Sequence, residues 1–294
     1  TDSNTTVSTI AVTAVNDVPV VDAHSTTTAY TENGVALAAN SAITLSDIDS
    51  ANLTGATVTI SNGYTTGDAL ALTSVNGITG VYNNSTHVLT LSGTATVAQY
   101  QAALQSVTFV STSDNPTATS ATRTLSWQVN DGASVNNLSS AVTSTLNITA
   151  VNDQPLTANL SYRGYEDTGA PVNGTTQGTL VSALEIIAGK DVDNSAIGVA
   201  FTSAISSTYG TTYYSLDNGT TWVNLTTATA SCSATNALVL GSTARVYYAG
   251  NANRAGTLAS PTIRLWDGTD GATSGTYVNL SLIHISEPTR PERI

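Results

Sequence analysis

The chain has 294 residues, and its 20 acidic and 8 basic side chains give a net charge of −12. That charge repels phosphate backbones and anionic lipid surfaces, which argues against nucleic acid as a partner. No apolar run approaches the roughly 20 residues that a membrane-spanning helix needs, so we expect no membrane insertion.

The amino-acid usage favours β-structure. Thr, Ser, Val, Asn, Gly and Ala dominate, and the strong helix formers Glu, Lys and Gln are scarce. Met is absent and there is no signal peptide, so we expect the chain to begin within a longer protein. Cys232 is the one cysteine, which rules out an internal disulfide and suits either the cytosol or a bacterial secreted protein.

The first predicted element recurs later in the chain. TVSTIAVTAVND (residues 6–17) matches VTSTLNITAVND (residues 142–153) in letters and in alternation. The apolar residues Ile10 and Val12, like Leu146 and Ile148, fall on one face, which predicts a strand buried on one side. Each copy ends in Asn-Asp-x-Pro, and because proline cannot continue a sheet ladder, we interpret each as the last strand of a domain.

The repeated phrase predicts the domain organisation. Residues 1–17 would end one repeat, residues 18–153 would form a complete repeat, and residues 154–279 would form a second, divergent and truncated one. Residues 280–294 (LSLIHISEPTRPERI) differ in composition and resemble a translated transposase-type sequencing adapter. We therefore expect this tail to be an artefact, with a native charged linker as the alternative.

Short strand-like runs with turn residues between them follow in the complete repeat. They begin at Ala56 (ATVTIS), Ala69 (ALALTSV), His87 (HVLTLSG), Val107 (VTFVS) and Arg123 (RTLSWQV). This spacing is typical of an antiparallel sandwich. One helix interrupts it at Thr96–Leu104, where a Thr cap precedes a Gln by three residues and apolar side chains follow at helical spacing.

The divergent repeat has its own hairpin signal. YYSLDNGTTWVNL (residues 213–225) contains Asp217, Asn218 and Gly219, which suit the positive-φ turn of a hairpin. TARVYYAG and PTIRLWDG predict two further strands, the second ending at an Asp-Gly turn. The fold class is thus predicted to be all-β, with tandem antiparallel sandwiches.

Taken together, the phrases resemble the tandem cadherin-like, VCBS-type Ig-like repeats of giant bacterial surface adhesins and type I secreted proteins. YTENG, LSDIDS, NNSTHVLTLSGTATVAQYQAAL and SDNPTATSATRTLSW are similar to one repeat type, and YYSLDNGTTW with RLWDGTDGATSG to a second. The resemblance covers nearly all of residues 1–279. It implies Greek-key sandwiches, an extracellular or cell-surface location, and neighbouring repeats of the same chain as partners.

The resemblance also implies calcium ions bound at the junctions between repeats. Hard Ca²⁺ takes six to eight oxygen ligands. One junction would gather Asn16, Asp17, Asp47 and Asp49; the next would gather Glu32, Asn152, Asp153, Asp191 and Asp193; Glu166 and Asp167 repeat the position of Glu32. A DRE tripeptide expected after THVLTLSG is replaced by VAQYQ, which predicts fewer ligands per site, with Asn130 and Asp131 as candidate substitutes.

Each signal has a plainer alternative. Asp-x-Asp in a Ser-rich loop also serves as a turn whose side chains cap local amides, and TDGATSG also suits a hairpin turn. Trp127 alternates with Leu125 and Val129, which predicts core packing; for Trp222 and Trp266 we expect sandwich plugs, with stacking on a sugar ring as the alternative.

We expect no enzyme, because the chain lacks a nucleophile elbow, HExxH and a phosphate-binding glycine loop. The resemblance implies calcium-rigidified stalk repeats of a bacterial adhesin that serve cell adhesion or biofilm formation. Two alternatives stay open. One is a module that binds a cell-surface glycan or receptor through Trp222 or the loop 112–120, and the other is a spacer attached to a secreted enzyme.

Overall fold

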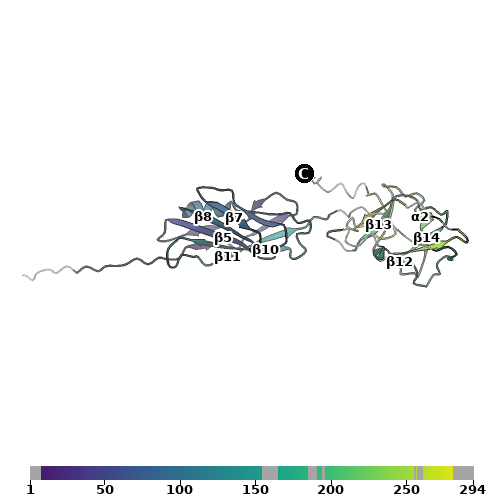
Figure 1. Ribbon diagram of the computed structural model, residues 1–294, viewed down its shortest axis with the longest axis horizontal. Helices are drawn as coiled ribbons and strands as arrows, with labels where there is room; N and C mark the ends of the chain where they lie inside the picture. The colour runs from purple at the N-terminus through teal and green to yellow at the C-terminus, as the bar shows by residue number, and fades with distance from the viewer. Residues whose placement is uncertain are drawn as a thin grey trace, which may run out of the picture. The chain divides into compact units, whose positions relative to one another are not determined.

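A computed structural model describes residues 8–153, 165–184, 191–193, 196–254, 256 and 261–280. The chain divides into two compact units, unit 1 (Thr1–Val151) and unit 2 (Asn152–Ile294). Both consist mainly of antiparallel β-sheets (Figure 1). Neither helix among the described residues is long and apolar enough to cross a membrane.

Unit 1 holds a six-stranded sheet, a three-stranded sheet and a two-stranded pair. The orders are β2-β11-β10-β5-β8-β7, β3-β9-β6 and β1-β4. The pairing of β2 with β11 is parallel and the other pairings are antiparallel. The strands are β1 (Val20–Asp22), β2 (Thr27–Thr31), β3 (Leu37–Ala38), β4 (Thr44–Ser46), β5 (Asn52–Asn62), β6 (Asp68–Ala71), β7 (Thr79–Asn83), β8 (Val88–Thr96), β9 (Thr108–Ser111), β10 (Thr122–Asn130) and β11 (Val142–Thr149).

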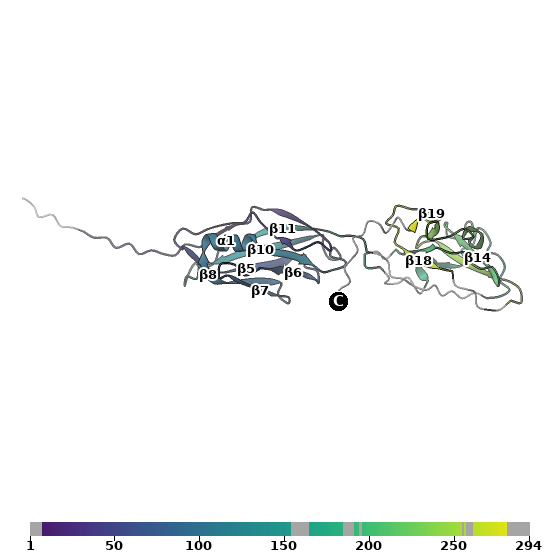
Figure 2. The same ribbon diagram turned by 90° about the horizontal axis from the view of Figure 1, so that it is seen from above.

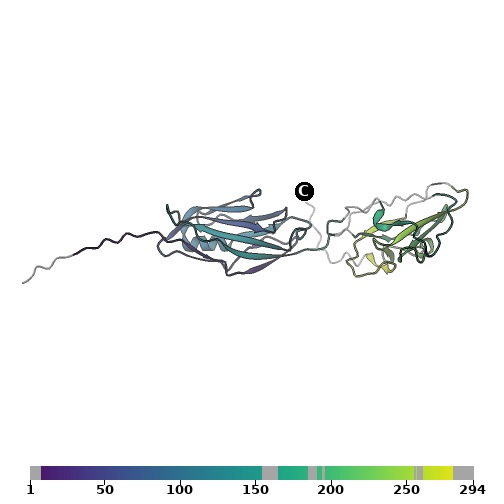
Figure 3. The same ribbon diagram turned by 90° about the horizontal axis from the view of Figure 1, so that it is seen from below.

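The core of unit 1 lies between its sheets. Along β10 every second residue is buried, and Leu125, Trp127 and Val129 are all at most 1% exposed. The core position predicted for Trp127 is confirmed, and its indole Nε1 donates to Ser144 Oγ at 2.9 Å. The rings of Tyr30 in β2 and Phe109 in β9 pack edge to face, with their centroids 5.1 Å apart. This contact joins the six-stranded sheet to the three-stranded one. The arrangement is sandwich-like, and Figure 3 shows the long strands side by side.

The predicted helix of unit 1 is confirmed as α1 (Val97–Gln105). Thr96 caps it: its Oγ1 accepts from Gln99 N at 3.2 Å, and Gln99 Oε1 accepts from Thr96 N at 3.0 Å. This reciprocal pair satisfies two helix-end donors. Figure 2 shows α1 at the end of unit 1 from which the N-terminal segment departs.

Unit 2 has two four-stranded sheets, ordered β12-β17-β14-β15 and β18-β13-β16-β19. The predicted hairpin is confirmed as β14 and β15, with positive φ at Asn218 and Gly219. The elements are β12 (Thr179–Leu180), the 3₁₀ turn η1 (Val181–Ala183), β13 (Gly198–Phe201), β14 (Gly210–Ser215), β15 (Val223–Asn224), α2 (Leu225–Ala228), β16 (Ala237–Leu240), β17 (Arg245–Gly250), β18 (Ile263–Trp266) and β19 (Tyr277–Val278).

The two tryptophans of unit 2, Trp222 and Trp266, are buried to different degrees. Trp266 is 7% exposed within a hydrophobic cluster, as a sandwich plug requires, whereas Trp222 is half-buried.

Leu280, the first residue of the segment interpreted as the tail, is 3% exposed in the same cluster as Trp266, and its N–H donates to Ala234 O. Residues 281–294 lie outside the described residues.

The two copies of the repeated phrase have different structures. The second copy forms β11, with Leu146 fully buried and Ile148 5% exposed. In the first copy residues 8–17 form no strand, and Ile10 and Val12 are 87% and 89% exposed; the assignment of this copy to the last strand of a preceding repeat stays a prediction. The difference lies in the neighbours, because β11 is flanked by β10 and β2 while residues 8–17 have no strand beside them within the described part of the chain.

Candidate metal centre

The two Asn-Asp pairs bond in the same way, each within one unit. Asn16 Nδ2 donates to Asp131 Oδ2 at 2.8 Å, and Asn152 Nδ2 donates to Asp267 Oδ2 at 2.7 Å. Both partners lie 115 residues along the chain. Each Asn-Asp pair is therefore bound by a residue of its own unit.

A second bond of each pair repeats as well. Asp17 N donates to Asp49 Oδ2 at 3.1 Å, and Asp153 N donates to Asp193 Oδ2 at 2.7 Å. The predicted Asp-x-Asp groups thus lie against the predicted Asn-Asp pairs in both units. Backbone N–H groups, which favour negative charge, hold the carboxylates in place.

The Asp-x-Asp groups also form the local turns given as their plainer interpretation. Asp47 Oδ1 accepts from Asp49 N at 3.2 Å and from Ser50 N at 2.9 Å. Asp191 Oδ1 accepts from Asp193 N at 2.9 Å. The other oxygen of Asp47, Oδ2, is buried and accepts no hydrogen bond from any described residue. A buried carboxylate oxygen in this state suits a cation, because leaving it without a partner is costly.

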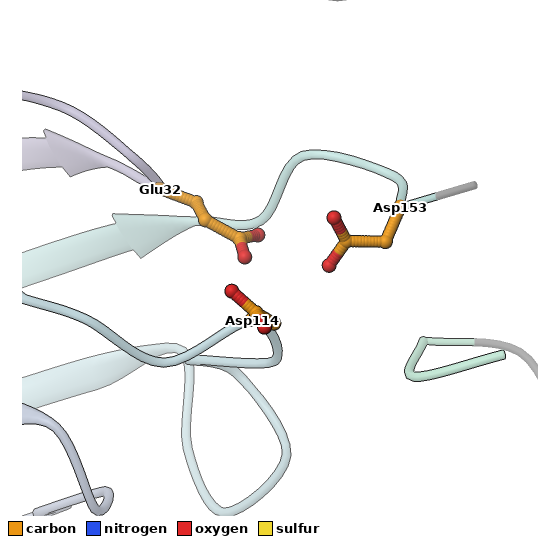
Figure 4. Close-up of side chains that lie close together, drawn as sticks. All are labelled: Glu32, Asp114 and Asp153. Carbon is orange, nitrogen blue, oxygen red and sulfur yellow. The ribbon is translucent and has the colours of Figure 1, made fainter. Parts of the chain in front are cut away.

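Three carboxylates lie close together beside the residues that follow β11. Glu32, Asp114 and Asp153 each offer one oxygen, and these oxygens all lie within 4.8 Å of one another (Figure 4). Glu32 is 3% exposed, and its Oε2 accepts from Val151 N at 2.8 Å. Glu32 N in turn donates to Thr149 O at 2.9 Å. Strand pairing between β2 and β11 thus places Glu32 beside the chain that leads to Asp153.

Asp114 lies on the loop between β9 and β10, and a buried ion pair holds that loop. Arg123 donates through its guanidinium to Pro116 O and Ser120 O, at 2.6 Å each, and to Asp68 Oδ2 at 2.6 Å. Both side chains of the ion pair are fully buried. Arg123 therefore ties this loop to Asp68 at the start of β6, which is far away in sequence.

Two predicted ligands do not join these groups. Glu166 is exposed, unlike Glu32, whose position it was expected to repeat. Asp167 lies at a positive φ of 61°, and its Oδ1 accepts from Asn253 N at 3.1 Å. Asp167 therefore takes part in local structure of unit 2.

The predicted ligand set does not include Asp114 and Asp267, and it includes Asp131 only as a candidate substitute. Asp131 and Asp267 had a signal, since each stands in an Asp-Gly pair after a strand at the same distance from an Asn-Asp pair. Asp114 had none, because its place beside Glu32 depends on how the loop folds back over the sheets.

The donor set favours a hard divalent cation. All of the grouped side chains supply carboxylate or amide oxygen, which Ca²⁺ prefers, and no histidine or cysteine stands among them. Three carboxylates this close repel one another unless a positive charge lies among them. The residues present thus fit a calcium ion. No family model matches this chain, and no curated protein matches it.

Proposed function

We propose that this chain is part of a calcium-stiffened stalk, built from tandem Greek-key, cadherin-like repeats, of a large bacterial surface or secreted adhesin. The observation that carries the proposal is the group formed by Glu32, Asp114 and Asp153, whose oxygens lie within 4.8 Å of one another. The recurrence of the Asn-Asp and Asp-x-Asp bonds in both units supports it.

The physical role of the ion follows from charge. Without a cation the grouped carboxylates repel one another, and the linker between repeats flexes. A bound Ca²⁺ removes the repulsion and fixes the linker. Extracellular calcium modules bind at about 10⁻⁴ to 10⁻³ M, so such sites fill outside the cell and stay empty in a cytosol. An ion that binds only the ordered state also stabilises it by mass action.

Calorimetry of the whole chain with added calcium and with a chelator tests the proposal. We expect a higher melting temperature with calcium, together with a narrower range of dimensions in small-angle scattering. Magnesium at the same concentration is the control, because its smaller octahedral shell fits a cluster of carboxylates less well. Identical melting and identical scattering in calcium and in chelator would remove the proposal.

A glycan- or receptor-binding module is the second candidate, and one observation favours it. The ring of Trp222 is half-buried, and its centroid lies 5.9 Å from that of the Tyr247 ring. A partly exposed pair of aromatic rings suits stacking on a sugar ring. Saturable binding on a glycan array that Trp222→Ala abolishes would support this candidate.

A further inference from the structure

Asparagine stands directly before glycine at five places in this chain: Asn33, Asn62, Asn76, Asn173 and Asn218. The glycine of such a pair has no side chain to shield its backbone nitrogen, so that nitrogen can attack the asparagine amide and close a five-membered succinimide ring. Ring closure requires that the glycine N–H is free and that the asparagine rotates about its ψ angle. The fold therefore decides which of the five pairs reacts.

Three of the pairs have a glycine N–H that donates a hydrogen bond. Gly34 N donates to Thr31 O at 2.9 Å. Gly174 N donates to Gly219 O at 3.0 Å, and Gly219 N donates to Ser215 Oγ at 2.8 Å. These bonds hold the nitrogen away from the asparagine amide that precedes it.

The strand ladder holds a fourth pair. Asn62 is the last residue of β5 and pairs with Thr124 of β10. Gly63 lies so close to the next strand that a Cβ on it would stand 2.1 Å from Thr122 O. Rotation about ψ of Asn62 therefore disturbs the pairing of β5 with β10.

The Asn76-Gly77 pair is the least restrained of the five. It forms the two-residue turn of the loop between β6 and β7, which Figure 2 labels, and its φ angles of 54° and 78° are those such a turn needs. Both residues are exposed, and no hydrogen bond joins the Asn76 side chain or the Gly77 N–H to a described residue. Two backbone bonds close the turn: Val75 N donates to Ile78 O at 3.1 Å, and Ile78 N donates to Val75 O at 2.8 Å.

We propose that Asn76 is a site of spontaneous modification, at which the chain converts its asparagine into aspartate and isoaspartate. A base in the solvent takes the Gly77 N–H proton, and the nitrogen bonds to Asn76 Cγ. The Cγ–Nδ2 bond breaks as Nδ2 takes a proton from water and leaves as ammonia. Water then opens the ring at either carbonyl, and no oxidant or reductant takes part. The reaction uses no carboxylate of the candidate metal centre, so it goes beyond the proposed function.

The isoaspartate product changes the backbone of the turn. It adds one carbon to the main chain between Val75 and Ile78, and a two-residue turn of fixed length can then no longer keep both closing bonds. Ile78 is fully buried in the core of unit 1. Gly93 of β8 packs so closely on the turn that a Cβ there would stand 2.4 Å from Gly77 O. The longer backbone therefore displaces a core residue, and unit 1 loses stability as the protein ages.

Peptide mass spectrometry of the whole chain, incubated in neutral buffer made with heavy-oxygen water, tests the site. Each converted asparagine takes up heavy oxygen, which separates conversion during incubation from conversion during digestion. We expect Asn76 to convert at least about tenfold faster than the other four, because each of those must break further hydrogen bonds before its ring closes. An intact Asn76, or another pair that converts as fast, overturns the proposal.

Thermal unfolding before and after incubation, in chelator, tests the consequence for unit 1. The variant Asn76→Gly keeps the positive φ but has no amide, so we expect it to keep its melting temperature. The matched control Asn33→Gly also replaces an exposed asparagine of positive φ before glycine, and we expect it to lose stability on incubation as the unaltered chain does. A carboxyl methyltransferase specific for isoaspartate measures the converted fraction. Equal losses in all three proteins overturn the link to Asn76, and since no calcium is present, that result leaves the calcium proposal untouched.

Discussion

Arg123 Nε donates to Asp68 Oδ2 at 2.6 Å, and both side chains are fully buried in unit 1. The remaining guanidinium donors reach Pro116 O and Ser120 O, so one side chain ties β10, the start of β6 and the loop that carries Asp114. Asp68 Oδ2 also accepts from Thr65 N at 2.8 Å. A buried ion pair is favourable only with such additional hydrogen bonds.

Asp68→Asn is therefore expected to lower the free energy of unfolding of unit 1 by about 3–5 kcal/mol, since it leaves a buried guanidinium without its counter-charge. Urea denaturation followed by Trp127 fluorescence measures the effect. The double variant Asp68→Leu/Arg123→Met is expected to recover part of the loss, because no charge is then buried. It does not recover all of it, because the loop carbonyls lose their donors. A single variant as stable as the unaltered chain would show that the ion pair has no structural role.

Glu32→Gln tests the acidic group at the end of unit 1. The amide keeps the shape of the side chain but removes one charge and one strong oxygen ligand, so we expect calcium to bind at least about tenfold more weakly. Isothermal titration with calcium measures the affinity. Asp22→Asn is the matched control, because Asp22 is exposed and pairs with His24 outside the acidic group. Equal affinities in the two variants would contradict a role of Glu32 as ligand.

The turn of the β14–β15 hairpin has a pH dependence that rests on Asp217. The hydroxyl and N–H of Thr221, followed by the hydroxyl of Ser215, donate to its carboxylate and lower its pKa from 3.8 to about 2. Because the pKa of Asp217 is lower in the folded protein than in the unfolded chain, its ionised carboxylate stabilises the fold at pH values above 3.8. This contribution is lost as the pH falls from 3.8 through about 2.

Thr221→Val is expected to raise the pKa of Asp217 toward its ordinary value, because it removes the first of these donors. The carboxyl carbon shift, followed by NMR from neutral to acid pH, reports the change. Thr220→Val is the control, since the Thr220 hydroxyl donates to the backbone O of Asp217 and not to its carboxylate. A pKa that moves equally in the two variants would contradict the assignment.

The cap of α1 gives a fourth prediction. Thr96→Ala removes the hydroxyl that accepts from Gln99 N, and we expect it to destabilise unit 1 by about 1 kcal/mol. Thr96→Ser keeps the hydroxyl and is expected to stay near the unaltered chain. Thermal unfolding of the three proteins distinguishes the cases, and equal losses for Ala and Ser would indicate that side-chain packing matters more than the cap.

Local sequence patterns were enough to predict several elements of the secondary structure. Alternation predicted the burial of Leu125 and Trp127, the Thr-x-x-Gln spacing predicted α1, and Asn218-Gly219 predicted a hairpin. These features depend on neighbours within a few residues, which the sequence displays directly. The same alternation assigns Ile10 to the last strand of a preceding repeat, and this assignment stays a prediction, because alternation states which face of a strand is apolar and not which sheet lies beside it.

For the candidate site, the sequence by itself determined which acids recur and that oxygen ligands dominate, since residue type and spacing are written in the chain. The tertiary structure alone decided that Asp114 lies with Glu32, that Asp131 and Asp267 hold the two Asn-Asp pairs, and that Glu166 stays apart. Those contacts join residues far apart in sequence, through strand pairing and through the loop fixed by Arg123. Whether two such residues come into contact depends on how the whole chain packs, and no short stretch of sequence carries that information.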